Sequence, residues 1–283
     1  MKPIHFSGVK IMTPRGKKKA LQGGNICAMI ITIIVNALAV ILPLNGKTTE
    51  YLSDKYPNLF VPAGITFSIL GIIYILWVVF AIYQARDLFK KEEIEMPFLH
   101  QITFLFILSS VANSAWIFAW QYEYVGLSLL LMIVLLFSLL AIYIRLNIGR
   151  TSASRTEKLC VHVPFSVYLG WITVATIANV TAFLVSVHWD GFGISQLSWT
   201  IVVISVGVLI TLLMLALRKD IAYSLVVIWA LLGIYIKRTN APFTNNDVAT
   251  TAIIAMGILI AGVIIIAVYQ LMRTKKKTAK KTP

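Results

Sequence analysis

The chain has 283 residues, of which 59% are hydrophobic and 13% charged, with a mean hydropathy of +0.85. A soluble globular protein carries about 45–50% apolar and about 25% charged residues, so this composition excludes that class. Two cysteines and nine prolines also exclude a disulfide scaffold and a collagen-like chain. The composition predicts an all-α, polytopic transmembrane bundle, because a helix satisfies its own backbone polar groups inside lipid.

Apolar segments of spanning length define the predicted helices, since one crossing needs about 20 residues. We expect about eight helices, the seventh being short, and a basic segment at each end, 1–25 and 273–283. The expected spans are 26–44, 60–85, 98–120, 124–144, 161–187, 196–217, 221–236 and 248–272.

The net charge of +14 comes from 25 basic residues that cluster at the ends of the expected spans. All but four of them fall on the side of the N-terminus, the exceptions being Lys47, Lys55, Lys237 and Arg238. Cytoplasmic loops collect Lys and Arg, so the pattern predicts a cell-membrane protein with both termini cytoplasmic. The expected partners of the basic tails are membrane lipids, and no nucleic-acid partner is expected because the tails lack a fold that reads bases.

The interior of the expected spans lacks the residues that carry most membrane chemistry. No Asp, Glu, Lys or Arg falls well inside a span, which counts against ion-coupled transporters and pumps. The sequence has no His or Cys spacing typical of a metal site, no nucleophile motif and no phosphate-binding glycine loop. We therefore expect neither an enzyme nor a cofactor.

Uncharged polar groups and tryptophans do occur within the spans. Each buried amide needs a partner, and two interpretations stay open: hydrogen bonds between helices, worth about 0.6–2 kcal/mol each, or orientation of a ligand in a cavity. Two tryptophans lie beside the asparagine-bearing faces instead of at a basic helix end, where such rings are usually found, and with a third they are candidates to line a pocket. The residues concerned are Asn36, Asn113 and Asn179, and Trp116, Trp120 and Trp171.

Three motifs resemble those of one membrane protein family. Residues 168–179, YLGWITVATIAN, resemble without a gap the fifth-helix signature of the translocator protein or tryptophan-rich sensory protein (TspO/MBR) family, roughly Tyr-Leu-Ala-Trp-x-x-Phe-Ala-Thr-x-Leu-Asn. Residues 113–116, NSAW, with Gly126 after them, are similar to its Asn-x-x-Trp stretch. Residues 68–74, SILGIIY, look like a worn form of its Pro-Val-Trp-Thr-x-Leu-Tyr motif.

The resemblance implies a five-helix bundle over 26–187, followed by three additional helices over 188–272. Family members bind tetrapyrroles and other flat hydrophobic molecules among the five helices, beneath the loop that joins helices one and two. Leu70 stands where the family has a pocket tryptophan, a departure that bears on tetrapyrrole binding and not on the fold. By position, the resemblance implies ligand-binding roles for Leu70, Tyr74, Asn113, Trp116, Trp171, Ala175 and Asn179.

The segment from Asn45 to Asn58 is either a lid over an outward-facing cavity or a polar connector. The first hypothesis for the whole chain is a sensory or binding protein for a planar, tetrapyrrole-like molecule. The alternatives are an uncoupled transporter or channel for a small solute, and a structural partner of another membrane protein. The sequence leaves open whether the chain forms a homo-oligomer.

Overall fold

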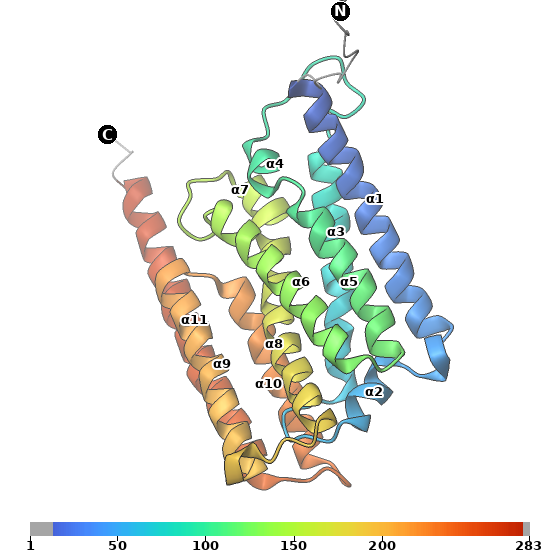
Figure 1. The fold of residues 1–283 in the computed structure, drawn as a ribbon. Coiled ribbons are helices and arrows are strands. Elements are labelled where there is room, and N and C mark those ends of the chain that lie inside the picture. Colours follow the sequence, from blue (N-terminus) through green and yellow to red (C-terminus); the bar gives the residue numbers. More distant parts are fainter. Residues whose placement is uncertain (1–13, 280–283) are drawn as a thin grey trace, which may run out of the picture.

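The computed structural model describes the backbone of residues 14–279 and the side chains of residues 15–273. Within this range the chain is a bundle of helices without a strand, as the sequence predicts (Figure 1). The outermost parts of the predicted basic segments, 1–13 and 280–283, lie outside the described residues. The main helices are α1 (Pro14–Ile41), α2 (Thr49–Lys55), α3 (Ile69–Gln84), α4 (Pro97–Ile102), α5 (Leu105–Gln121), α6 (Val125–Arg145), α7 (Arg155–Glu157), α8 (Val163–Ser186), α9 (Gln196–Arg218), α10 (Ile221–Thr239) and α11 (Asn246–Ala279).

Seven helices of the described chain are long and apolar enough to cross a membrane, and α5, with 17 residues, is a shorter apolar helix. The chain is therefore a multi-pass membrane protein. The span expected at 221–236 is α10, which continues to Thr239 and, with 19 residues, is short as predicted. Helix α5 is shorter than the span expected at 98–120, since Thr103 has a φ of 54° and separates α5 from α4.

Helix α1 is helical from Pro14, the first described residue, well before the expected start at residue 26. The helix therefore includes the basic run at 17–19, in which Lys18 is buried against Asp87. At the other end of the chain α11 continues to Ala279, past the expected end of its span at residue 272.

Helix α8 lies at the centre of the bundle and packs against α3, α6 and α10 (Figure 1). Helix α5 packs between α1 and α6, and α11 packs against α9 and α10. A Cβ atom at Gly170 would lie 3.0 Å from the carbonyl oxygen of Tyr223 and 3.2 Å from Cβ of Val226. The missing side chain thus lets α10 approach α8 closely, as small residues do between membrane helices.

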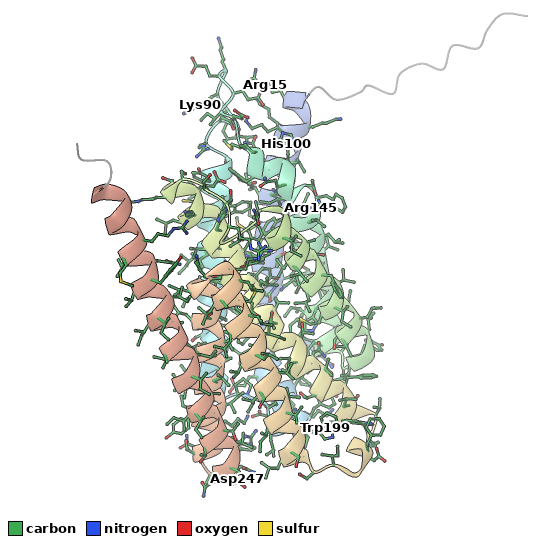
Figure 2. All side chains as sticks on the ribbon, turned by 90° about the vertical axis from the view of Figure 1, so that its left-hand side faces the viewer. Arg15, Lys90, His100, Arg145, Trp199 and Asp247 are labelled. Carbon is green, nitrogen blue, oxygen red and sulfur yellow. The ribbon has the colours of Figure 1, made fainter. Side chains whose placement is uncertain are left out.

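The two ends of the bundle differ. The start of α1 and the end of α11 lie at one end, here called the terminal face, and α2 lies at the other, here called the lid face (Figure 1). Figure 2 shows Arg15, Lys90 and Arg145 toward the terminal face, and Trp199 and Asp247 at the lid face. The described helices therefore cross an even number of times.

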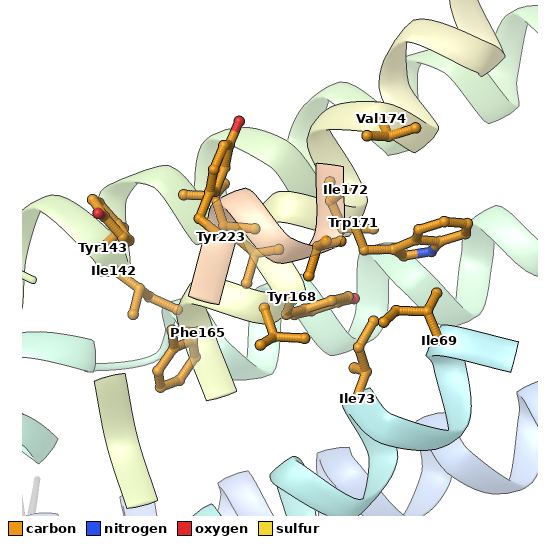
Figure 3. Close-up of a cluster of buried hydrophobic side chains, with 14 of the residues drawn as sticks. Ile69, Ile73, Ile142, Tyr143, Phe165, Tyr168, Trp171, Ile172, Val174 and Tyr223 are labelled. Carbon is orange, nitrogen blue, oxygen red and sulfur yellow. The ribbon is translucent and has the colours of Figure 1, made fainter. Parts of the chain in front are cut away.

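Aromatic side chains fill the bundle toward the terminal face. The rings of Trp77 and Tyr168 have centroids 4.7 Å apart, and those of Phe80 and Phe165 are 5.2 Å apart, both edge to face. Phe106 touches Trp77, Phe80 and Phe165 in the same way. Figure 3 shows the part of this core around α8. Edge-to-face pairs add about 0.5–1.5 kcal/mol beyond burial, so this half of the bundle is firmly closed.

Candidate functional site

A cavity of about 400 Å³ lies among α1, α3, α5, α6 and α8. Three of these helices, α3, α5 and α8, carry the motifs at 68–74, 113–116 and 168–179. The segment around α2 covers it. All seven residues with a predicted binding role lie on its wall: Leu70, Tyr74, Asn113, Trp116, Trp171, Ala175 and Asn179. The tertiary structure thus brings the three motifs together, while the binding role of each residue stays a prediction.

Two of the membrane asparagines join three helices through one chain of hydrogen bonds. Asn36 Nδ2 donates to Asn113 Oδ1 at 2.7 Å, and Asn113 Nδ2 donates to the hydroxyl of Tyr168 at 3.0 Å. The predicted bonds between helices are therefore confirmed. Asn36 and Asn113 also line the cavity. Both interpretations, hydrogen bonds between helices and orientation of a ligand, therefore concern the same two side chains.

Asn179 holds the indole of Trp116. Trp116 Nε1 donates to Asn179 Oδ1 at 2.8 Å, and Asn179 Nδ2 donates to Ser128 Oγ at 3.0 Å. The ring of Trp116 stacks on that of Trp120, with centroids 5.8 Å apart and planes 13° from parallel. Trp120 Nε1 donates in turn to the carbonyl of Thr49 at 3.4 Å. Both indole donors are thus used inside the protein, and the rings are held in fixed orientations.

The opposite wall carries Trp171, whose ring meets that of Phe67 edge to face at 5.8 Å. All three tryptophans proposed as pocket residues, Trp171 among them, therefore line the cavity. Tyr74 also faces it, and within the described chain its buried hydroxyl has no hydrogen-bond partner. Leaving a buried donor unsatisfied costs about 1–3 kcal/mol, so this hydroxyl is suited to a polar atom of a ligand.

The segment that was predicted to be a lid or a connector covers the cavity. Four of its residues line the cavity on the side of the lid face: Thr48, Thr49, Glu50 and Ser53. Thr48 caps α2, since its side chain accepts a hydrogen bond from the N–H of Tyr51 at 3.1 Å. Such a cap stabilises even a short helix by about 1 kcal/mol. We refer to residues 44–63 as the lid.

The lid is fixed along one edge to the turn between α5 and α6. Lys47 and Lys55 both donate to the carboxylate of Glu123, and the hydroxyl of Tyr56 donates to it at 3.2 Å. The hydrogen bonds from Lys47 and Lys55 lower the pKa of Glu123 to about 2, against the opposing effect of burial. Leu52 is fully buried beneath this edge and packs with Trp120.

The other edge of the lid is fixed to the last turn of α10. Lys237 pairs with Asp54, and Arg238 donates to the carbonyl oxygens of Asn58 at 2.9 Å and Leu59 at 3.2 Å. Sequence reasoning counted both basic residues as outer-loop charges and missed this role. The sequence feature that could have revealed this role is the position of the two residues directly after an apolar span, on the side of the membrane that is otherwise poor in basic residues. Helix α10 thus reaches the lid without lining the cavity.

A second hollow, of about 570 Å³, lies between α8 and α9. Its threonines bond carbonyls of their own helices, Thr176 to Ile172 at 2.7 Å and Thr200 to Gln196 at 2.8 Å. None of the seven predicted residues is on its wall. The lidded cavity is the stronger candidate, because small-molecule sites combine apolar walls with a few convergent polar groups.

A buried polar cluster closes the bundle at the terminal face. Lys18 Nζ lies 2.5 Å from Asp87 Oδ2, and the two side chains are only 6% and 3% exposed. Gln22 donates to Asp87 Oδ1 at 2.8 Å, and Asn25 donates to Gln84 Oε1 at 2.9 Å. Burial alone would raise the pKa of Asp87, but the bonds from Lys18, the backbone N–H of Ile94 and Gln22 outweigh it and lower that pKa to about 2.

A family model described as "TSPO-like protein" matches residues 21–266. The matched region covers most of the chain and includes α9, α10 and much of α11, so it extends beyond residue 187, where the motif resemblance ends. The division of the chain at that residue stays a prediction. Neither a curated protein nor a solved structure matches the chain.

Proposed function

The chain belongs to the TSPO-like protein family, and on that premise we propose that it binds a planar hydrophobic small molecule of the tetrapyrrole type in the lidded cavity, in a sensory or binding role. The observation that carries the proposal is the meeting of all seven motif residues on the wall of one cavity of about 400 Å³. Pockets for small molecules measure about 300–1,000 Å³, so the size suits this role.

The chemistry of the walls supports a flat ligand. Stacked Trp116 and Trp120 and the edge-to-face pair of Trp171 with Phe67 give the cavity rigid aromatic sides. Aromatic rings bind other rings through offset stacking and edge contacts, so a planar body would be held with little loss of side-chain freedom.

The packing toward the terminal face supports binding over conduction. Between the cavity and the terminal face, the bundle is filled by aromatic side chains that are each about 1% exposed: Trp77, Phe80 and Phe106. A solute in the cavity therefore meets closed packing in that direction. The alternative, an uncoupled transporter or channel, predicts flux of small amphipathic solutes into proteoliposomes, whereas the binding role predicts sealed vesicles.

Quenching of tryptophan fluorescence tests the proposal. Purified protein in nanodiscs is titrated with protoporphyrin, with haem and with etioporphyrin, a porphyrin that has no carboxylates. We expect saturable quenching by at least one of the three, weakened about tenfold or more by Ala175→Phe, which fills the cavity. Trp171→Phe should also weaken binding.

The matched control is Leu209→Phe on α9, where the side chain is 57% exposed and the substitution should change nothing. Quenching that never saturates, or equal affinities in the wild type and both cavity variants, would overturn the proposal.

We also propose that the terminal face is cytoplasmic and that the protein resides in the cell membrane, as the excess of basic residues at that face suggests. Peptide tags at the two termini should resist protease added outside intact cells. Digestion of either tag would contradict this orientation.

A further inference from the structure

The lid places one carboxylate at the mouth of the cavity. Glu50 is the charged side chain among the described residues that line the cavity, whose other members are apolar, aromatic or neutral and polar. Gly64 leaves room for it: a Cβ atom built there would lie 1.7 Å from Glu50 Oε1. The exposed carboxylate thus lies close to the backbone that enters α3.

The other acidic side chains beside the lid have basic partners. Asp54 pairs with Lys237, and Glu123 pairs with both Lys47 and Lys55. Across the described part of the chain, no hydrogen bond or ion pair involves the carboxylate of Glu50. The neighbouring cations are therefore engaged elsewhere, and Glu50 gives the mouth of the cavity a negative charge.

Deeper in the cavity than Glu50, the wall has more aromatic ring faces than free hydrogen-bond donors. Trp116 and Trp120 direct their indole N–H groups to Asn179 and Thr49, and each of the wall asparagines uses its amide group inside the bundle. Such a wall has no cation to hold a ligand carboxylate. Ring faces bind the planar body of a ligand through stacking and edge contacts, which leaves the charged group of the ligand to the mouth, beside Glu50.

We propose that the ligand of this cavity is an organic cation: a planar apolar body that carries an amine or quaternary ammonium group. The charged group lies beside Glu50 at the mouth, and the planar body lies deeper, among Trp116, Trp171 and Phe67. This inference rests on the proposed function, because it names the chemical class of the molecule that the same cavity binds.

Three fluorescent probes with one planar body test the inference: pyrenylmethyl-trimethylammonium, pyrenemethanol and pyreneacetate. Each is titrated into the protein in nanodiscs of zwitterionic phosphatidylcholine, and the signal from empty nanodiscs is subtracted. We expect the cation to bind about tenfold more tightly than the neutral alcohol, and the anion to bind most weakly.

Glu50→Gln should remove the preference for the cation and leave the affinity for pyrenemethanol within about twofold of wild type. Glu50→Lys should reverse the order, so that pyreneacetate binds best. The control is Asp247→Asn at the lid face (Figure 2), which makes the same change of charge outside the cavity wall and should leave all three affinities unchanged.

The outcomes separate this inference from the proposed function. Equal affinities for the three probes in the wild type, or a cation preference that survives Glu50→Gln, would overturn the inference while the cavity remains a binding site. If no probe binds saturably, or Ala175→Phe leaves their binding unchanged, both the proposed function and the inference fail.

Discussion

The two ends of the bundle use the same kind of ion pair at different depths. At the terminal face the side chains of Lys18 and Asp87 are 6% and 3% exposed. At the lid face Lys47 and Glu123 are 28% and 21% exposed, and Lys55 is 45% exposed. Breaking a buried pair costs about 3–5 kcal/mol, whereas an exposed pair contributes about 0–1 kcal/mol. The terminal face is therefore held by the stronger ion pair and the lid face by the weaker ones.

The largest effect is expected at the terminal face. Lys18→Ala should lower the free energy of unfolding by about 3–5 kcal/mol, because it leaves the carboxylate of Asp87 buried without a cation. Titration with sodium dodecyl sulfate in mixed micelles measures this change. The double variant Lys18→Met/Asp87→Asn should recover most of the loss, since no charge then remains. A loss below about 1 kcal/mol in Lys18→Ala would show that this end is as loosely held as the lid.

Acid should act on both faces within one pH window. The pKa values of Asp87 and Glu123 are lowered to about 2 in the folded protein, so both groups bind protons more readily when unfolded. Their contributions to stability are fully present above about pH 4.5 and are lost as the pH falls toward 2, and for Asp87 the loss is about 2 kcal/mol. Between pH 7 and 5 the contributions of these two groups to the unfolding midpoint should therefore be constant.

Asp87→Asn should reduce that acid-dependent loss more than Glu123→Gln does, because Glu123 is more exposed and better screened. An equal reduction in the two variants would contradict the difference drawn between the faces.

Removing the ion pair that joins the lid to α10 should have an effect of intermediate size on lid opening. The Lys237 side chain is 8% exposed and its partner Asp54 is 35% exposed. Lys237→Met should raise the population of open lid about five- to tenfold, equivalent to about 1–1.4 kcal/mol. The readout is the rate at which an impermeant maleimide labels Ser53→Cys, with Cys27 and Cys160 replaced by Ala. Lys219→Met on the terminal face is the control. If Lys237→Met leaves the labelling rate unchanged, α10 does not restrain the lid.

The smallest effect is expected at the exposed pair on the other edge. Lys55→Ala should change the labelling rate of Ser53→Cys less than about fivefold, because exposed pairs contribute about 0–1 kcal/mol. Lys47→Ala should have a somewhat larger effect, since Lys47 is more buried and bonds the same carboxylate. A change of twentyfold or more in Lys55→Ala would mean that the two edges of the lid do not differ.

The spacing of the fifth-helix motif explains why three of the residues that the family resemblance singled out lie on one cavity wall. Trp171, Ala175 and Asn179 are four residues apart, so one face of α8 presents all three, whatever surrounds the helix. The same periodicity could not identify the lid, because Glu50 and Ser53 lie on a short helix whose position depends on Leu52 and its distant partners.

The sequence by itself determined the membrane class and the approximate number of helices, which follow from the apolar length that a bilayer requires. The residues that meet at the cavity were implied by the resemblance of three motifs to one family, and the tertiary structure brings them together. Only the tertiary structure decided which charges are buried. Lys18 is 69 residues from Asp87 and Lys237 is 183 residues from Asp54 in the chain. A count of charges on each side of the membrane gives no information about such pairs, because a buried lysine is stabilised by a partner that the packing of separate helices supplies.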